Sequence, residues 1–103
     1  MSENEFGTQR LDEIMRQRSL ENGDLVSAST EQLTYKQVQK GCKGRRLSLR
    51  LMQKVARALN VAIWTPLSDE KKERFVEYQH SDLFSYAKGF RDEWSDPNVA
   101  LMP

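Results

Sequence analysis

The sequence predicts an all-α protein of five to six short helices. Apolar residues recur every three or four positions in several stretches, which is the spacing of a helix that buries one face. Ser or Thr stands where three helices are expected to begin, at positions 34, 48 and 68. A chain of 103 residues that is 38% hydrophobic and 30% charged suits a single domain with a modest core. The expected organisation is a disordered tail at 1–8, a single helical domain at 9–95 and a second tail at 96–103.

The first two expected helices are short. Apolar positions three and four apart predict an amphipathic helix over 9–18. After a break, a second helix is expected to begin at Asn22 or Gly23, with a weaker apolar pattern. A turn is expected at 29–32, before the next helix.

Thr34 is the expected N-cap of a third helix that ends near Cys42. Tyr35, Val38 and Cys42 are three and four residues apart, so they are expected to form its buried face. Polar and basic residues then occupy the exposed arc, namely Lys36, Gln37, Gln39, Lys40 and Lys43. A basic loop is expected at 43–47.

Ser48 is the expected N-cap of a fourth helix, which shows the clearest pattern in the chain. Its apolar stripe consists of Leu49, Met52, Val55, Ala56 and Leu59. Arg50, Lys54 and Arg57 form a second stripe at spacings of four and three, and Asn60 is expected to end the helix. Alternatively, Leu47, Leu49 and Leu51 face one side of a short strand, but the alternation stops at residue 52.

The C-terminal part is expected to form helices within 68–90. Ser68 begins one of them, with acidic residues in the first turn that the helix dipole favours, and Ser81 begins another that ends near Gly89. The aromatic residues of this part are expected in the core, and they are Trp64, Phe75, Tyr78, Phe84, Tyr86, Phe90 and Trp94. Residues 64–94 either pack on the preceding helices or form a homodimer contact.

The charge of the chain is strongly segregated. Between Leu33 and Asn60 lie eight of the 16 basic residues and none of the 15 acidic ones. We call these eight the basic centre, and they are Lys36, Lys40, Lys43, Arg45, Arg46, Arg50, Lys54 and Arg57. Ordinary surfaces intersperse the two signs, so such a segment indicates a surface for a polyanion, of which nucleic acid is the commonest. The structural alternative is internal pairing with Asp12, Glu13, Glu70 or Glu73.

The order of the central elements is that of a helix-turn-helix domain. A recognition helix needs an apolar face against the scaffold and long hydrogen-bonding side chains toward the major groove. The stretch 34–43 meets both requirements. Base contacts are expected from Thr34, Lys36, Gln37 and Lys40, and backbone contacts from Lys43, Arg45, Arg46, Arg50 and Lys54.

The stretch LTYKQVQKGCKGRRLSLRLMQKVARALNV resembles the second half of a Cro/repressor-type helix-turn-helix domain. The resemblance extends over about residues 11–61 and implies a core at 22–61 that binds duplex DNA. It places the recognition positions on Thr34, Tyr35, Lys36, Gln37 and Lys40. In the first motif helix Ala28 fits the family's small residue, whereas Gln32 stands at the turn glycine and Ser27 at an apolar position. The chain also resembles a group of small uncharacterised bacterial proteins with "DLV-x-AS-x-EQLT" and "GRR" patterns, which implies no activity.

Other chemistry has no signature in the sequence. Cys42 is interpreted as a small buried residue and His80 as a surface residue. There is no Ser-His-Asp order, no metal-ligand spacing and no cofactor fingerprint. The sequence therefore predicts a cytoplasmic, non-enzymatic DNA-binding protein without metal or cofactor that regulates transcription, and the resemblance implies a bacterial protein. Two alternatives remain, namely an RNA- or ribosome-binding protein that uses the same basic face, and a protein-interaction adaptor.

Overall fold

The computed structural model describes residues 5–102, and within them it contains helices and no strand. The all-α prediction is therefore confirmed, and the short strand considered around residue 49 is not formed. The helices are α1 (Arg10–Gln17), α2 (Asn22–Ala28), α3 (Tyr35–Lys43), α4 (Leu49–Trp64), α5 (Asp69–Arg74), α6 (His80–Leu83) and the 3-10 helix η1 (Val99–Leu101).

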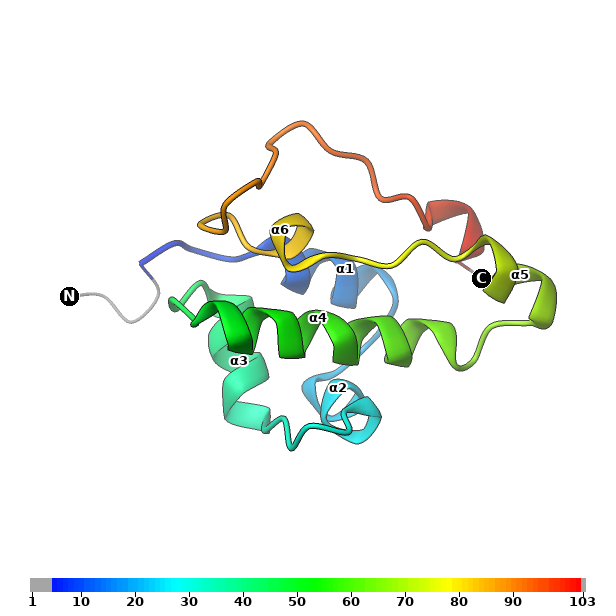
Figure 1. Cartoon of the computed structure of the whole chain (residues 1–103), viewed down its shortest axis with the longest axis horizontal. Helices are drawn as coiled ribbons and strands as arrows, with labels where there is room; N and C mark the ends of the chain where they lie inside the picture. The colour runs from blue at the N-terminus through cyan, green and yellow to red at the C-terminus, as the bar shows by residue number, and fades with distance from the viewer. Residues whose placement is uncertain (1–4, 103) are drawn as a thin grey trace.

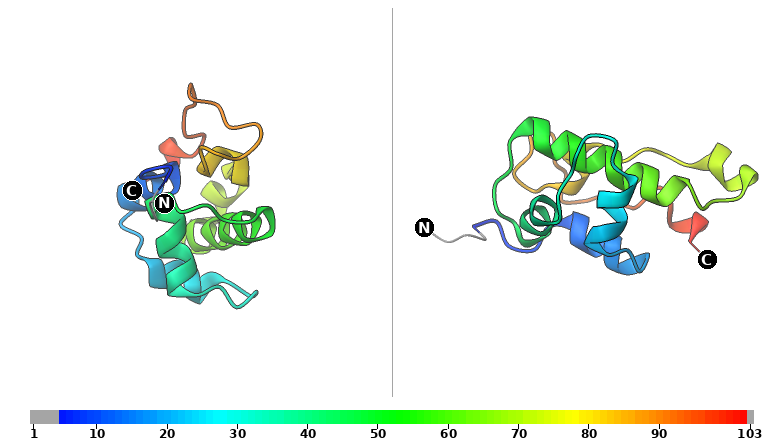
Figure 2. Two further views of the ribbon diagram at one scale, coloured as in Figure 1. Left: turned by 90° about the vertical axis from the view of Figure 1, so that its left-hand side faces the viewer. Right: turned by 90° about the horizontal axis from the view of Figure 1, so that it is seen from below.

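Helix α4 runs along the long axis of the molecule and organises the other elements (Figure 1). Helices α2 and α6 pack against α4, while α1 packs against α3 and α6. Helix α3 crosses the N-terminal half of α4 at a steep angle, and the right-hand view of Figure 2 shows α3 end-on where α4 is seen lengthwise. The chain after α6 arches over α1 before it returns toward α5 (Figure 1).

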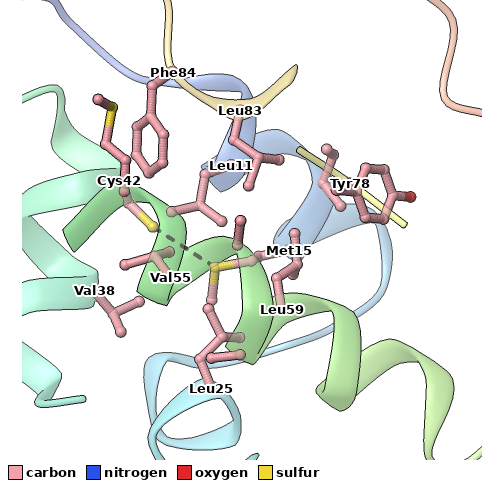
Figure 3. Close-up of a cluster of buried hydrophobic side chains, with 14 of the residues drawn as sticks. Leu11, Met15, Leu25, Val38, Cys42, Val55, Leu59, Tyr78, Leu83 and Phe84 are labelled. Atoms are coloured by element: carbon pink, nitrogen blue, oxygen red, sulfur yellow. Dashed lines mark hydrogen bonds between the residues drawn. The ribbon is translucent and has the colours of Figure 1, made fainter. Parts of the chain in front are cut away.

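The core lies between α1, α2, α3, α4 and the C-terminal segment (Figure 3). Each of these elements contributes large side chains with 7% exposure or less. They include Leu11, Met15, Leu25, Val38, Cys42, Val55, Leu59, Tyr78, Leu83 and Phe84. The apolar spacing in the sequence therefore identified most of the core correctly.

Helix α4 differs from its prediction at both ends. It continues to Trp64 because Ile63, only 5% exposed, extends the buried stripe beyond Asn60. The side chain of Asn60 instead accepts a hydrogen bond from Tyr78 N (2.8 Å) and donates one to Tyr78 O (3.0 Å). At the other end, Leu49 is 55% exposed, because the stripe enters the core only at Met52.

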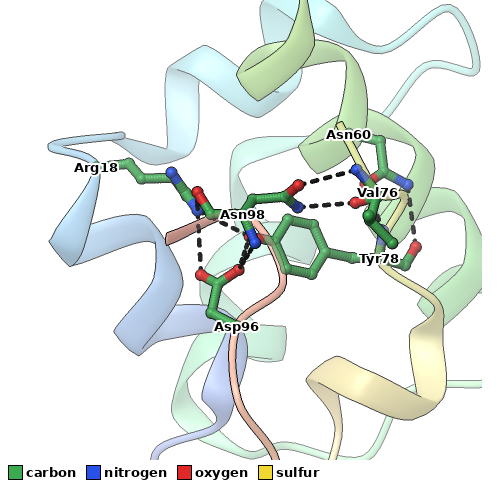
Figure 4. Close-up of polar contacts among 6 residues, drawn as sticks. All are labelled: Arg18, Asn60, Val76, Tyr78, Asp96 and Asn98. Atoms are coloured by element: carbon green, nitrogen blue, oxygen red, sulfur yellow. Dashed lines mark hydrogen bonds and ion pairs between the residues drawn. The ribbon is translucent and has the colours of Figure 1, made fainter. Parts of the chain in front are cut away.

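The tail expected at 96–103 needs correction, because residues 96–102 belong to the folded domain. Asn98 has no exposed surface and satisfies the backbone of Val76, with its Oδ1 accepting from Val76 N (2.8 Å) and its Nδ2 donating to Val76 O (2.7 Å). Asp96 accepts from the Tyr78 hydroxyl (2.6 Å) and pairs with Arg18 (3.1 Å) (Figure 4). These polar contacts hold the last residues against α1 and the segment before α6.

The expected disordered tail at 1–8 also needs correction where it is described. Residues 1–4 lie outside the described part of the chain. Phe6, in contrast, stacks on Tyr86 at 4.4 Å between ring centroids, and its N–H donates to Gly44 O (3.1 Å). The buried Gln9 adds hydrogen bonds to Phe6 O, Gly7 O and Ser85 N. The segment therefore bridges the end of α3 and the C-terminal part.

The C-terminal helices are shorter than predicted, since α6 is a single turn that begins after Gln79. Tyr78 and Phe84 are buried as expected, and Phe75, Tyr86, Phe90 and Trp94 are half-buried. Trp64 is the exception at 43% exposure, with Lys72 lying over its ring at 4.4 Å.

Candidate nucleic-acid interface

Helix α3 is fixed in place by its first turn and its buried face. The Thr34 hydroxyl accepts from Gln37 N (3.2 Å) and Gln37 Oε1 accepts from Thr34 N (3.1 Å), which forms a capping box. Val38, Gly41 and Cys42 face the core. The helical period then places three cations together on the opposite, outer face, namely Lys36, Lys40 and Lys43.

The connection between α2 and α3 has a backbone feature that the sequence pattern did not predict. Gln32 has φ +60°, in the left-handed region that favours glycine. Gln32 stands at the position where the resemblance places a turn glycine. The following residue, Leu33, is buried and anchors the turn, while Ser27 is exposed. Both polar residues that depart from the family pattern therefore fit this structure. Gln32 adopts a left-handed backbone, and the side chain of Ser27 is exposed to solvent.

A groove of about 410 Å³ lies between the start of α3 and the exposed side of α4. Gln37 lines it from α3, while Arg50 and Lys54 line it from α4. The two cations share one face of α4 because they are four residues apart. The remaining lining residues are Glu31, Ser48, Leu51 and Arg57.

Most of the basic centre is not neutralised within residues 5–102. Five of its cations lie on the outer face of α3 or along the groove and form no ion pair with a carboxylate in that range, namely Lys36, Lys40, Lys43, Arg50 and Lys54. Arg57 is paired, but with Glu31 and with none of the four acidic residues that the sequence suggested. Of those four, Asp12 pairs with Arg16 inside α1 (2.9 Å).

Tyr35 does not belong to the buried face of α3, contrary to the prediction. It is 63% exposed, and its hydroxyl end lies where a Cβ on Gly23 would be. As the first residue of the helix, Tyr35 precedes the turn that enters the core. The absence of a side chain at Gly23 lets the tyrosine lie along α2.

The capping box constrains the expected role of Gln37. A bidentate contact with adenine uses both the amide oxygen and the amide nitrogen of glutamine. The oxygen of Gln37 already accepts from Thr34 N, and the Thr34 hydroxyl is engaged in return. A bidentate base contact therefore competes with the cap, whereas donation by Gln37 Nε2 into the groove does not.

The loop after α3 is held toward the C-terminal segment. Tyr86 accepts from Leu47 N (2.8 Å) and donates to Arg45 O (3.4 Å) through its hydroxyl group. The guanidinium of Arg46 lies 5.7 Å from the ring centroid of Phe6 and 5.8 Å from that of Tyr86. Arg46 therefore faces this aromatic pair and does not line the groove, so the structure divides the basic centre between two places.

No protein-family model matches this chain, and neither the curated proteins nor the solved structures contain a match to it. Among residues 5–102, no three His, Cys, Asp or Glu side chains are grouped so that they could hold a metal ion. None of the helices described is both long and apolar enough to cross a membrane.

Proposed function

We propose that the protein binds duplex DNA through the outer face of α3 and the adjoining groove, and that it acts as a small regulator of transcription. The observation that carries this proposal is the combination of Lys36, Lys40 and Lys43 on one helix face with Arg50 and Lys54 along the groove beside it. In the described part of the chain, none of these five has a carboxylate partner. Unneutralised cations release counterions from phosphates, which supplies most of the non-specific affinity for DNA.

The scaffold beneath these cations supports DNA over other polyanions. Helix α3 has a capped first turn and a buried inner face, so it is a rigid element that a major groove can accept. The order of α2, a turn that contains the left-handed residue Gln32, and α3 resembles that of a helix-turn-helix unit, although the connection over 29–34 is longer than the usual turn of about three to four residues. Gln37 supplies a hydrogen-bonding side chain at the protein groove between α3 and α4, and contact with base edges needs such a side chain.

The test is fluorescence anisotropy with random-sequence duplex DNA and duplex RNA over a salt series. We expect wild-type protein to bind the DNA duplex with a steep salt dependence, to which each neutralised phosphate contributes a slope of about 0.9. The triple variant Lys36→Gln, Lys40→Gln, Lys43→Gln should flatten that slope. The matched control Lys71→Gln, Arg74→Gln, Lys88→Gln removes the same charge outside the basic centre and should change the slope less.

Three outcomes contradict the proposal. Equal slopes for the two triple variants remove α3 from the interface. Preference for duplex RNA favours the RNA- or ribosome-binding alternative, because A-form helices are recognised by shape and by 2′-hydroxyl groups. No affinity for either duplex at about 100 mM salt favours the protein-interaction adaptor.

Selection of bound sequences from a random duplex pool then tests the proposed role in regulation, since a sequence-specific regulator enriches a defined site.

A further inference from the structure

One carboxylate, that of Glu31, lies inside the groove of the candidate interface. Glu31 Oε2 accepts from Arg57 Nε at 2.7 Å, and Oε1 accepts from Arg57 Nη2 at 2.7 Å. The two parallel bonds engage one whole edge of the guanidinium, which is the geometry that this group also uses to bind a phosphate. The hydrogen bonds and charge of Arg57 hold the pKa of Glu31 below its usual value, and the charge of Lys54 acts in the same direction.

The position of Glu31 is set by the backbone on one side and by α4 on the other. Its N–H donates to the hydroxyl of Ser29 (3.1 Å), and the next residue is the left-handed Gln32. Arg57 projects from the exposed side of α4, one turn beyond Lys54. Two elements 26 residues apart in the chain therefore meet at this pair.

The pair changes what the groove offers to a polyanion. Arg50, Lys54 and Arg57 form a stripe at spacings of four and three, which would give three phosphate-binding cations along α4. Because Glu31 occupies the Nε–Nη2 edge of Arg57 and neutralises its charge, Arg57 offers less to a phosphate than Arg50 and Lys54 do. The carboxylate also repels any phosphate that enters the groove.

We propose that Glu31 is a specificity-determining residue, which withholds Arg57 from phosphates and so weakens binding to duplexes that offer phosphate contacts alone. This inference rests on the proposed DNA binding by α3 and the groove. Specificity is a difference of affinities, and a repulsive group that acts on every sequence lowers the non-specific term. Contacts between α3 and base edges then carry a larger share of the total affinity.

The experiment compares Glu31→Gln with wild type on random-sequence duplex DNA over a salt series. Release of Arg57 should tighten binding by roughly threefold to tenfold near 100 mM salt and steepen the salt slope by about 0.9, the value for one additional neutralised phosphate. The matched control is Glu73→Gln, which removes the same charge from an exposed position on α5. It should leave the slope unchanged.

The same substitution in a protein that lacks Arg57 identifies the cation that is released. In an Arg57→Gln protein, the further change Glu31→Gln should no longer steepen the slope, because the Arg57 guanidinium is no longer there to be released. The Arg57 Nε–H resonance in NMR spectra of the free protein reports the ion pair without nucleic acid. We expect it to shift in Glu31→Gln and to keep its position in Glu73→Gln.

The outcomes separate this inference from the proposed function. If wild type binds DNA and Glu31→Gln behaves like Glu73→Gln, the role of Glu31 is overturned while DNA binding stands. Weaker binding by Glu31→Gln overturns it as well, because the carboxylate would then be a contact to the bound duplex. If only Glu31→Gln binds, the role of Glu31 is supported. If no protein binds, both proposals fall.

Discussion

Cys42 shows how burial at a single position in the core changes the pKa of a side chain. The residue is 7% exposed, and its thiol donates to the sulfur of Met15 at 3.7 Å (Figure 3). Burial raises the pKa of the Cys42 thiol to about 12, the charge of Asp12 acts in the same direction, and Arg16 opposes both. The group therefore remains a neutral thiol throughout the physiological range, and the interpretation of Cys42 as a buried apolar residue is confirmed.

The raised pKa of Cys42 predicts a loss of stability in alkaline solution. The unfolded thiol ionises near pH 9 and the folded one near 12, so its stabilising contribution is complete below pH 9 and is lost as pH rises toward 12. Urea unfolding at about pH 8 and pH 10.5 should show wild type losing about 2 kcal/mol more than Cys42→Ala. Tyr78, whose pKa is also raised to about 12, is present in both proteins. Equal losses of stability in wild type and Cys42→Ala would contradict the assignment of the raised pKa to Cys42.

At the scale of elements, the end of α3 depends on a close approach of two backbone segments. Gly44 ends the helix with φ +94°, and a Cβ at this position would overlap the backbone of Gly7. The N-terminal segment therefore lies directly against the turn from which the basic loop starts. Because Tyr86 holds the other side of that loop, the position of the loop depends on both the N-terminal segment and the segment after α6.

Gly44→Ala is therefore expected to destabilise the protein by more than the left-handed backbone alone would cost. The matched control is Gly89→Ala, which has a similar φ of +91° but only an ordinary contact at 3.7 Å with Ser81 Cβ. The control should be destabilised by about 1–2 kcal/mol, the usual penalty of a side chain in this conformation. Urea midpoints measure both, and equal effects would mean that the N-terminal segment does not lie against the turn.

At the scale of the whole molecule, the C-terminal segment contributes buried side chains to the core and is also held by polar contacts with distant residues. Asn98 joins Val76, and Asp96 joins Tyr78 and Arg18 (Figure 4). These contacts span 18 to 78 residues of chain. They make residues 75–102 part of a single folded unit with the basic centre.

Asn98→Ala tests whether this segment belongs to the cooperative unit. The substitution removes both hydrogen bonds to the backbone of Val76, so we expect the free energy of unfolding to fall by about 1–3 kcal/mol. The Val76 amide proton should also exchange faster. Val99→Ala changes the neighbouring residue, which is 58% exposed, and should cost less than about 0.5 kcal/mol. If Asn98→Ala leaves the free energy of unfolding unchanged, residues 96–102 are a tail outside the cooperative unit.

The errors of the sequence-based predictions share one physical cause. Tyr35 and Leu49 have apolar side chains at helical spacing, yet both stand in the first turn of a helix, before that helix reaches the core. Asn60 and Asn98 have polar side chains, yet both satisfy backbone groups 18 and 22 residues away. Local spacing reports which face a helix can bury, whereas burial at a particular residue depends on where other elements lie.

The candidate site was predicted unevenly for the same reason. The helix of 34–43 and the stripe of Arg50 and Lys54 follow from local pattern, and the groove brings Gln37 to that stripe. The separate position of Arg46 depends on Phe6 and Tyr86. Glu31 was missed because its partner Arg57 is distant in sequence. The only local signal was an acidic residue five positions before Lys36, the first residue of the basic centre.

The sequence by itself determined the helical class, most of the buried positions and the concentration of cations in the middle of the chain, because each depends on the composition and spacing of neighbouring residues. Only the tertiary structure decided which cations share a surface, that Arg57 pairs with Glu31, and how Gly7 and Tyr86 lie on either side of the basic loop. Those features depend on distances between segments far apart in sequence, and these are set by the packing of the whole chain around α4.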